Sequence, residues 1–252
     1  MTLHASKKIL IFALAGIATY FCACDNENLP DYMKSAGDTD TRTTTLPKGL
    51  KNLVVDNNFK VTLVPDTEDY IIIKYGVNLM ENVSITANVD NSTVTLADAT
   101  TGKIVRNNKP VPEAEYHFSN IENIVVHSHS SITSTDSVDI ASYTFDERIG
   151  ALDVVSKAPV VSLTVSDGTG EYTLRGKADS ISIKAHYTSI VKAENMQTKA
   201  ASVENHSTGN VYVTSANKVY AEIHHTGNIY VNNKATTILS NNSGKGKILK
   251  TD

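Results

Sequence analysis

The segments VENHSTGNVYV (Val203–Val213) and AEIHHTGNIYV (Ala221–Val231) repeat one pattern eighteen residues apart. In each, a polar stretch passes through Thr-Gly-Asn into a short run of alternating apolar residues. Such alternation is typical of a β-strand with one buried face, and the glycine marks a turn. The adjacent histidines His224 and His225 therefore belong to one turn of a repeat, which is a simpler interpretation than an isolated metal-binding motif.

The pattern extends beyond these two segments in both directions. When one small residue in each turn is taken as an anchor, the steps between anchors are 20, 20, 19, 20, 18 and 19 residues. The anchors are Ser130, Gly150, Gly170, Ser189, Gly209, Gly227 and Gly246. A fixed period of this length, with strand rather than helix patterning, indicates a solenoid whose turns stack on one another.

Apolar residues recur with a period of two on both sides of the anchors, which predicts two strands in each turn, or rung. The positions two residues after the anchors are Ile132, Leu152, Tyr172, Val191, Val211, Ile229 and Ile248. The predicted fold is therefore all-β, a parallel β-helix-like solenoid of two-strand rungs of about 19 residues.

The region before the array, Leu50–Asp98, keeps the alternation but has longer loops. Within it, VVDNNFKVTL (Val54–Leu63) fits the rung pattern, and the remainder predicts hairpins that cap the start of the solenoid. Residues Thr100–Glu115 contain two prolines and few apolar side chains, so they are predicted to form a loop.

The N-terminus predicts export. Lys7 and Lys8 precede an apolar run from Ile9 to Cys22, which has the length of a signal peptide and is shorter than the roughly 20 apolar residues of a spanning helix. Phe21-Cys22-Ala23 before Cys24 resembles a lipobox, although Phe21 replaces the usual leucine. Cys24 is the predicted lipid-attachment site, and simple secretion is the alternative.

These features divide the chain into three parts. Residues 1–23 are the predicted lipoprotein signal peptide, and residues 24–45 are a polar, threonine-rich segment predicted to be a flexible tether. Residues 46–252 form the predicted single β-solenoid domain. The lipid at Cys24 predicts a membrane partner, because more than one acyl chain gives stable anchoring.

Composition and motifs exclude several classes of function. The formal net charge of −4 gives no basic footprint for a nucleic-acid partner. The chain contains no GxSxG, HExxH or phosphate-binding loop motif, so no catalytic residue and no cofactor are predicted.

An export signal with a lipobox, a tether, an FKVTL strand and repeated TGNVYV and TGNIYV turns together resemble the family called putative auto-transporter adhesin, head GIN domain. The resemblance covers about Leu46 to Lys250, and the sequences HSHSS, ERIG and HYTS depart from the family's usual Gly-Ser-Gly bends. It implies a right-handed parallel β-helix-like fold on the cell surface or the periplasmic face. It implies no catalytic residue.

Two columns of side chains are candidate sites. His186, His206 and His224 each lie three residues before an anchor, so stacked rungs would place them about 4.8 Å apart as an outward-facing ladder. A polar ladder is the favoured interpretation; zinc binding is the alternative, but a straight ladder is a poor tetrahedral cage. Tyr212 and Tyr230 should also stack, either to stabilise the sheet or to accept the face of a sugar.

The functional prediction is a non-enzymatic, lipid-anchored outer-membrane protein, surface-exposed or periplasm-facing, that acts as an adhesin or structural module. Its predicted partners are a glycan or a host or cell-surface protein. The alternative is a carbohydrate-active enzyme, a polysaccharide lyase or hydrolase on a β-helix. A deep groove with two carboxylates at catalytic separation would favour the enzyme.

Overall fold

A computed structural model describes residues 35–100, 110–146, 149–232 and 234–251. The predicted signal peptide, Cys24 and most of the predicted tether lie outside these ranges. The chain separates into two compact units, and the larger one, residues 36–99 and 110–252, contains all the described strands.

Each rung of the unit has two walls of strands joined by bends. The strands are β1 (Thr39–Thr45), β2 (Asn52–Asp56), β3 (Lys60–Pro65), β4 (Tyr70–Gly76), β5 (Val83–Asn88), β6 (Thr93–Asp98), β7 (Glu113–Phe118), β8 (Asn123–His127), β9 (Ser130–Val138), β10 (Ser142–Phe145), β11 (Ile149–Ser156), β12 (Val160–Val165), β13 (Thr169–Lys177), β14 (Ser180–Ser207), β15 (Val211–Ile223), β16 (Ile229–Asn232), β17 (Thr237–Asn242) and β18 (Ile248–Thr251). A 3₁₀ helix, η1 (Val77–Asn82), joins β4 to β5.

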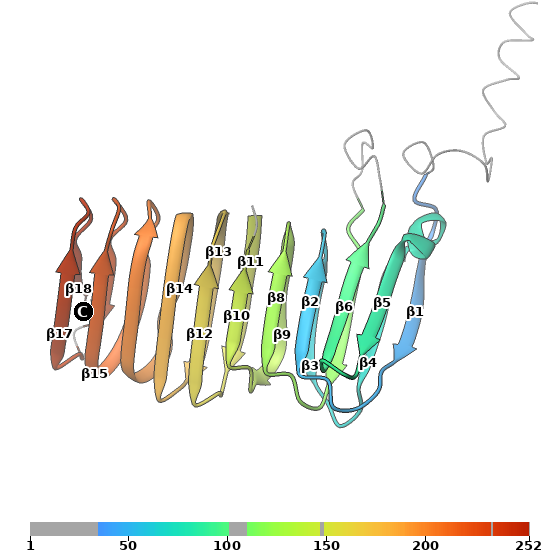
Figure 1. Cartoon of the computed structure of the whole chain (residues 1–252), viewed down its shortest axis with the longest axis horizontal. Coiled ribbons are helices and arrows are strands. Elements are labelled where there is room, and N and C mark those ends of the chain that lie inside the picture. The colour runs from blue at the N-terminus through green and yellow to red at the C-terminus, as the bar shows by residue number, and fades with distance from the viewer. Residues whose placement is uncertain (1–34, 101–109, 147–148, 233, 252) are drawn as a thin grey trace, which may run out of the picture. The chain divides into compact units, whose positions relative to one another are not determined.

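Equivalent strands of successive rungs pair in parallel (Figure 1). The first wall contains β6, β2, β8, β10 and β12, and the second contains β7, β3, β9, β11 and β13. The long strands β14 and β15 bend around the stack and supply segments to both walls, and β17 and β18 form the last rung. The parallel two-strand solenoid predicted from the sequence is confirmed.

The predicted anchors lie in one column. Gly150 is in register with both Ser130 and Gly170, and Gly170 is in register with Ser189. Further along, a Cβ atom added to Gly209 would lie 2.1 Å from the carbonyl oxygen of Ser189, and one added to Gly227 would lie 1.9 Å from that of Gly209. The backbones approach so closely at these bends that a side chain has no room.

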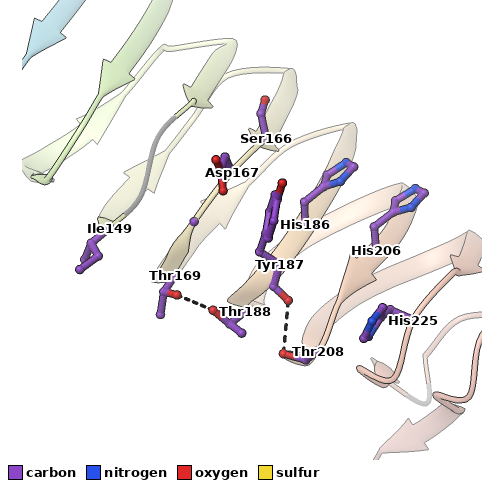
Figure 2. A pocket seen from close by; sticks show the side chains of 11 residues that line it. Ile149, Ser166, Asp167, Thr169, His186, Tyr187, Thr188, His206, Thr208 and His225 are labelled. Carbon is purple, nitrogen blue, oxygen red and sulfur yellow. Dashed lines mark hydrogen bonds between the residues drawn. The ribbon is translucent and has the colours of Figure 1, made fainter.

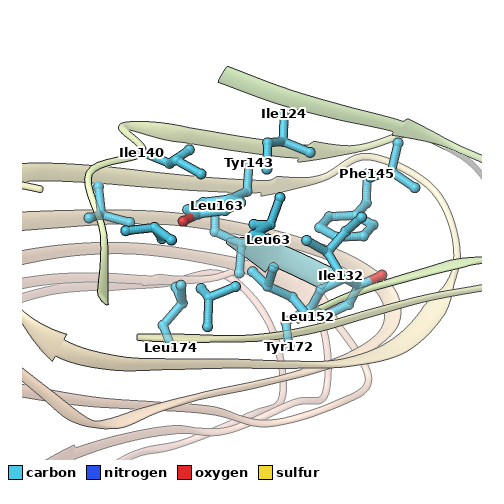
Figure 3. Close-up of a cluster of buried hydrophobic side chains, with 14 of the residues drawn as sticks. Leu63, Ile124, Ile132, Ile140, Tyr143, Phe145, Leu152, Leu163, Tyr172 and Leu174 are labelled. Atoms are coloured by element: carbon cyan, nitrogen blue, oxygen red, sulfur yellow. The ribbon is translucent and has the colours of Figure 1, made fainter. Parts of the chain in front are cut away.

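The core runs between the two walls (Figure 3). The side chains that point inward from the predicted alternating positions are buried, as shown by Leu152, Tyr172 and Leu163, which are at most 2% exposed. The rings of Phe145 and Tyr172 meet edge to face, with centroids 4.8 Å apart. Burial of these apolar side chains is the main favourable contribution to folding, and the ladders satisfy the backbone groups beside them.

At the N-terminal end the order of stacking departs from the order of the chain. The rung β2–β3 lies between the later rungs β6–β7 and β8–β9. Strand β4 runs antiparallel to β7, and the hairpin β5–β6 is also antiparallel. The predicted first rung and a capping hairpin are therefore present, but the rung lies inside the stack.

Two predicted boundaries are wrong. The predicted tether ended at residue 45, yet Thr39–Thr45 form β1, which pairs antiparallel with β4. The β-branched threonines favour this extended strand, and Arg42 fixes it by donating to the carbonyl oxygen of Val83 at 2.6 Å. The predicted loop ended at Glu115, but β7 begins at Glu113, because alternating residues Ala114 and Tyr116 enter the core.

Candidate functional site

The bends that lead from the first wall to the second carry most of the candidate residues. In the bend Asn205–Gly209, the side-chain amide of Asn205 donates to the carbonyl oxygen of Gly209 at 3.1 Å, and its oxygen accepts from the Ser207 N–H at 2.9 Å. The Ser207 hydroxyl donates to the Ser189 carbonyl of the preceding rung at 2.9 Å. These bonds hold the bend closed and tie it to its neighbour.

The three histidines form the predicted ladder. The ring centroids of His186 and His206 lie 4.5 Å apart with an interplanar angle of 3°, and those of His206 and His224 lie 4.1 Å apart at 8°. His224 is oriented by Glu222, which lies 3.3 Å from its Nε2 atom, and by Ser243, which lies 3.0 Å from its Nδ1 atom. Burial, together with the neighbouring His224 and His186, lowers the pKa of His206 and so favours its neutral form.

This geometry suits a polar ladder better than a metal centre. Imidazole binds a metal through a nitrogen lone pair in the plane of the ring. In rings stacked face to face, these lone pairs run parallel and do not converge on one point. Within the described residues, no group of three or more His, Cys, Asp or Glu side chains is placed to hold a metal ion.

Tyr212 and Tyr230 stack as predicted, with centroids 4.7 Å apart and planes at 8°. Each ring therefore covers one face of the other. Along the column, Lys192 is next in register to Tyr212, and Leu249 is next to Tyr230. The hydroxyl groups accept from Asn210 and Asn228, at 3.4 and 3.3 Å. Mutual stacking thus removes one face of each ring from contact with a ligand.

A groove of about 740 Å³ lies over the bends of the middle rungs (Figure 2). Its size is within the range of small-ligand sites, roughly 300–1,000 Å³. It contains two members of the histidine ladder, His186 and His206, whereas the tyrosine pair lies elsewhere. The lining residues are Ile149, Ser166, Asp167, Gly168, Thr169, His186, Tyr187, Thr188, His206, Thr208 and His225.

A row of three exposed threonines, Thr169, Thr188 and Thr208, runs along the stack among the lining residues. The hydroxyl groups of Thr169 and Thr188 hydrogen-bond to each other, and the Thr208 hydroxyl donates to the carbonyl oxygen of Tyr187 at 3.2 Å. Among the lining residues that the structure describes, Asp167 is the one carboxylate and none is lysine or arginine; Glu147 and Arg148, beside Ile149, lie outside the described residues. The described lining therefore holds one of the two carboxylates that the predicted enzymatic alternative requires.

Tyr187 is the groove residue that the sequence analysis missed. Its φ angle of 59° lies in the left-handed region, which a bulky residue rarely adopts, and its side chain is 58% exposed. Ser128 and Gly168 occupy the same position in earlier bends, two residues before their anchors, and also have positive φ. The departure of HYTS from the usual small-residue bend was the available signal.

The model of the family described as "putative auto-transporter adhesin, head GIN domain" matches residues 49–235. The chain belongs to this family. The match excludes the edge strand β1 and the last rung, β17–β18, so the head GIN domain as it folds here extends beyond the matched residues at both ends.

Solved structures share the fold at low sequence identity. A putative adhesin from Bacteroides fragilis has a TM-score of 0.75 at 13% identity, with 85% of this chain and 97% of that chain covered. Putative adhesins from Parabacteroides distasonis and Parabacteroides merdae have TM-scores of 0.60 and 0.56, at 12% and 13% identity, covering 85% and 86% of this chain and 98% and 97% of theirs. A search of curated proteins found no match.

The predicted membrane attachment at Cys24 lies outside the described residues. Within those ranges, no helical segment has the length and hydrophobicity required to cross a bilayer. The attachment stays a prediction from the lipobox-like sequence.

Proposed function

We propose that this head GIN domain protein is an exported, lipid-anchored adhesin of the outer membrane, which binds a glycan or a protein of another cell surface without catalysis. Membership of the adhesin family carries the proposal. The signal-like N-terminus and Cys24 support the anchor, because a diacylated cysteine gives stable membrane binding.

The groove supports binding rather than catalysis. It lies over the bends, and its described lining residues include one carboxylate, Asp167, beside hydroxyl and imidazole groups. Glycoside hydrolysis by the common mechanisms uses a pair of carboxylates on either side of the scissile bond. A rigid stack that holds polar groups in fixed positions is well suited to recognition, since little conformational entropy is lost on binding.

The two cysteines, Cys22 and Cys24, allow a matched test of the anchor. Four bacterial strains are compared. Three produce the full-length wild type, its Cys24→Ala variant or its Cys22→Ala variant, and the fourth is a deletion strain that lacks the chain. We expect labelled fatty acid to be incorporated into the wild type and Cys22→Ala but not into Cys24→Ala. Adhesion to host epithelial cells should follow the same order, with Cys24→Ala reduced to the level of the deletion strain.

Two outcomes would contradict the proposal. Equal fatty-acid labelling of the Cys24→Ala variant would show that Cys24 is not the anchor. Equal adhesion by the deletion strain and the wild type, on every surface tested, would remove the adhesive function itself.

A further inference from the structure

The groove exposes an aromatic ring that the solenoid does not need for its own packing. At the same bend position, Gly168 and Ser128 adopt positive φ with small side chains, whereas Tyr187 adopts it with a large one. A bulky residue in this conformation costs about 1–3 kcal/mol and persists where the surroundings enforce it, frequently at ligand-binding sites. The ring is 58% exposed.

The contrast with Tyr212 shows what is special about this ring. Tyr212 and Tyr230 stack on each other and cover their faces. Among the described residues, no aromatic ring stacks on Tyr187, whose side chain stands between Asp167 and His186 in the view of Figure 2. Tyr187 is therefore an exposed ring in the groove lining that no other described aromatic ring covers.

Polar groups with unused hydrogen-bonding capacity surround this ring. Within the described residues, the Asp167 carboxylate and the ring nitrogens of His186 and His206 have no hydrogen-bond partner. Small-molecule sites combine an apolar or aromatic surface with a few fixed polar groups, and this groove has both.

The charge of the groove favours an uncharged ligand. Asp167 is the one carboxylate among the described lining residues, none of which is lysine or arginine, and burial with the neighbouring histidines lowers the pKa of His206, which favours its neutral form. An anionic sugar or a phosphate would meet this carboxylate with no lysine or arginine among the described lining residues to compensate it.

The bends also disfavour an extended peptide. Peptides that add to a sheet need unpaired backbone groups along an edge. Here the Thr208 N–H already donates to the Tyr187 carbonyl at 2.7 Å, and the Gly227 N–H donates to the Ser207 carbonyl at 3.0 Å. A ligand at these bends would therefore meet side chains rather than a row of unpaired backbone groups.

We infer that this groove binds a pyranose residue of an uncharged glycan. The apolar C–H face of the sugar packs on the exposed ring of Tyr187, and its hydroxyl groups bond to the Asp167 carboxylate and to the imidazole of His186. The inference rests on the proposed adhesive function and adds the class of ligand.

The test uses the full-length protein in a detergent that contains no sugar. The probes are methyl glycosides of glucose, galactose, mannose and N-acetylglucosamine, with methyl sialoside as the anionic comparison, and saturation-transfer NMR reports binding. We expect at least one neutral glycoside to bind in preference to the sialoside, and Tyr187→Gly to weaken that binding about tenfold or more. Asp167→Asn should weaken it as well.

Tyr187→Gly is chosen because glycine accepts the left-handed conformation, so the variant should fold at least as stably as the wild type. Tyr212→Ala is the matched control, which removes a tyrosine outside the groove and should leave sugar binding unchanged. Unchanged binding by a folded Tyr187→Gly variant, preferential binding of the sialoside, or no binding of any neutral glycoside by the wild type would overturn the inference.

Adhesion of whole cells separates this inference from the proposed function. If adhesion is lost on deletion of the chain but persists with Tyr187→Gly, the sugar site is wrong and the adhesive function stands. If adhesion persists on deletion as well, the proposed function fails. Loss of adhesion with Tyr187→Gly, together with rescue by Tyr187→Phe, supports the ring as the sugar platform, because Phe keeps the aromatic face.

Discussion

The two ends of the solenoid are built by different rules. From β11 onward each rung stacks directly on the rung that precedes it in the chain, and the strands are parallel. Before β8 the chain places its first rung between two later ones and closes the stack with antiparallel strands. The repeat therefore sets the stacking order only in the region where a short bend joins each strand of one wall to the next strand, in the other wall.

The difference has a physical origin in the edges of the sheet. An open edge strand presents unpaired backbone groups and invites association with other chains. At the N-terminal end, β1 and β5 occupy the two edges, and the walls beneath them pair fully. At the C-terminal end, β17 and β18 are edge strands whose inward residues Ile238 and Ile248 are only partly buried. Stability should therefore be distributed unequally along the stack.

The largest effect is expected where the regular rungs approach most closely. In Gly209→Val, the new Cβ would lie 2.1 Å from the Ser189 carbonyl oxygen, a backbone atom that cannot move without separating two rungs. We expect a loss of more than about 3 kcal/mol in the free energy of unfolding, measured by urea denaturation.

Gly49→Ala serves as the comparison for this substitution. Gly49 has a φ of +90° but nothing within 4 Å of an added Cβ, so the cost is conformational alone, about 1–2 kcal/mol. Gly209 has no positive φ, so if its variant loses no more stability than Gly49→Ala, close stacking of the backbones is not the reason for glycine at this position.

The second test asks whether β2–β3 is an internal rung. Leu63 in β3 is fully buried, and the strand pairs with both β7 and β9. We expect Leu63→Ala to lower the free energy of unfolding by about 3 kcal/mol, as for Leu163→Ala in the regular array. Ile238→Ala in the last rung should cost only about 1 kcal/mol, because that side chain is partly exposed. A small cost for Leu63→Ala would place β3 at an end of the stack.

The third test compares two bends that an asparagine closes in the same way, one buried and one exposed to solvent. Asn205 and Asn242 make the same bonds, each donating to the carbonyl oxygen four residues later, but Asn205 is fully buried and Asn242 is exposed. Replacing Asn205 with alanine strands buried backbone groups and should cost about 2 kcal/mol, whereas Asn242→Ala should cost less than about 1 kcal/mol because water replaces the amide. Thermal unfolding followed by circular dichroism measures both; equal costs would mean that burial is irrelevant to the bend.

What the sequence could predict follows the same division between regular and irregular regions. Side chains at equivalent positions of a repeat must stack once the rungs stack, so the columns of His186, His206 and His224 and of Tyr212 and Tyr230 followed from spacing alone. The pattern could not place β3 inside the stack, because two longer connections leave several pairings open.

The groove could be predicted only in part. Thr169, Thr188 and Thr208 each lie one residue before an anchor, so the period aligns them in a row, but nothing in the sequence marked that row as part of a groove. The positive φ recurs two residues before the anchors, at Ser128 and Gly168, and the departure of HYTS from small residues was the one signal that a large ring occupies this position at Tyr187. Regular features of a solenoid are thus readable from its period, and its recognition surfaces arise from departures from that period.

The smallest expected effect concerns pH and the histidine ladder. The pKa of His206 is lowered from 6.5 by burial and by His224 and His186, while Glu204 and Glu222 act in the opposite direction. The unfolded chain therefore binds a proton at higher pH than the folded chain does, so the stability contributed by neutral His206 is complete above about pH 6.5 and decreases as the pH falls below it. The carboxylates with lowered pKa values titrate separately, Asp66 and Asp179 below 3.8 and Glu222 below 4.5.

Urea denaturation of the wild type and of His206→Gln, repeated between pH 7.5 and pH 5, isolates this contribution. The wild type should lose stability over the interval, and His206→Gln, which keeps a polar side chain without a titrating ring, should lose less. If both proteins show the same pH dependence, protonation of His206 does not change the free energy of unfolding.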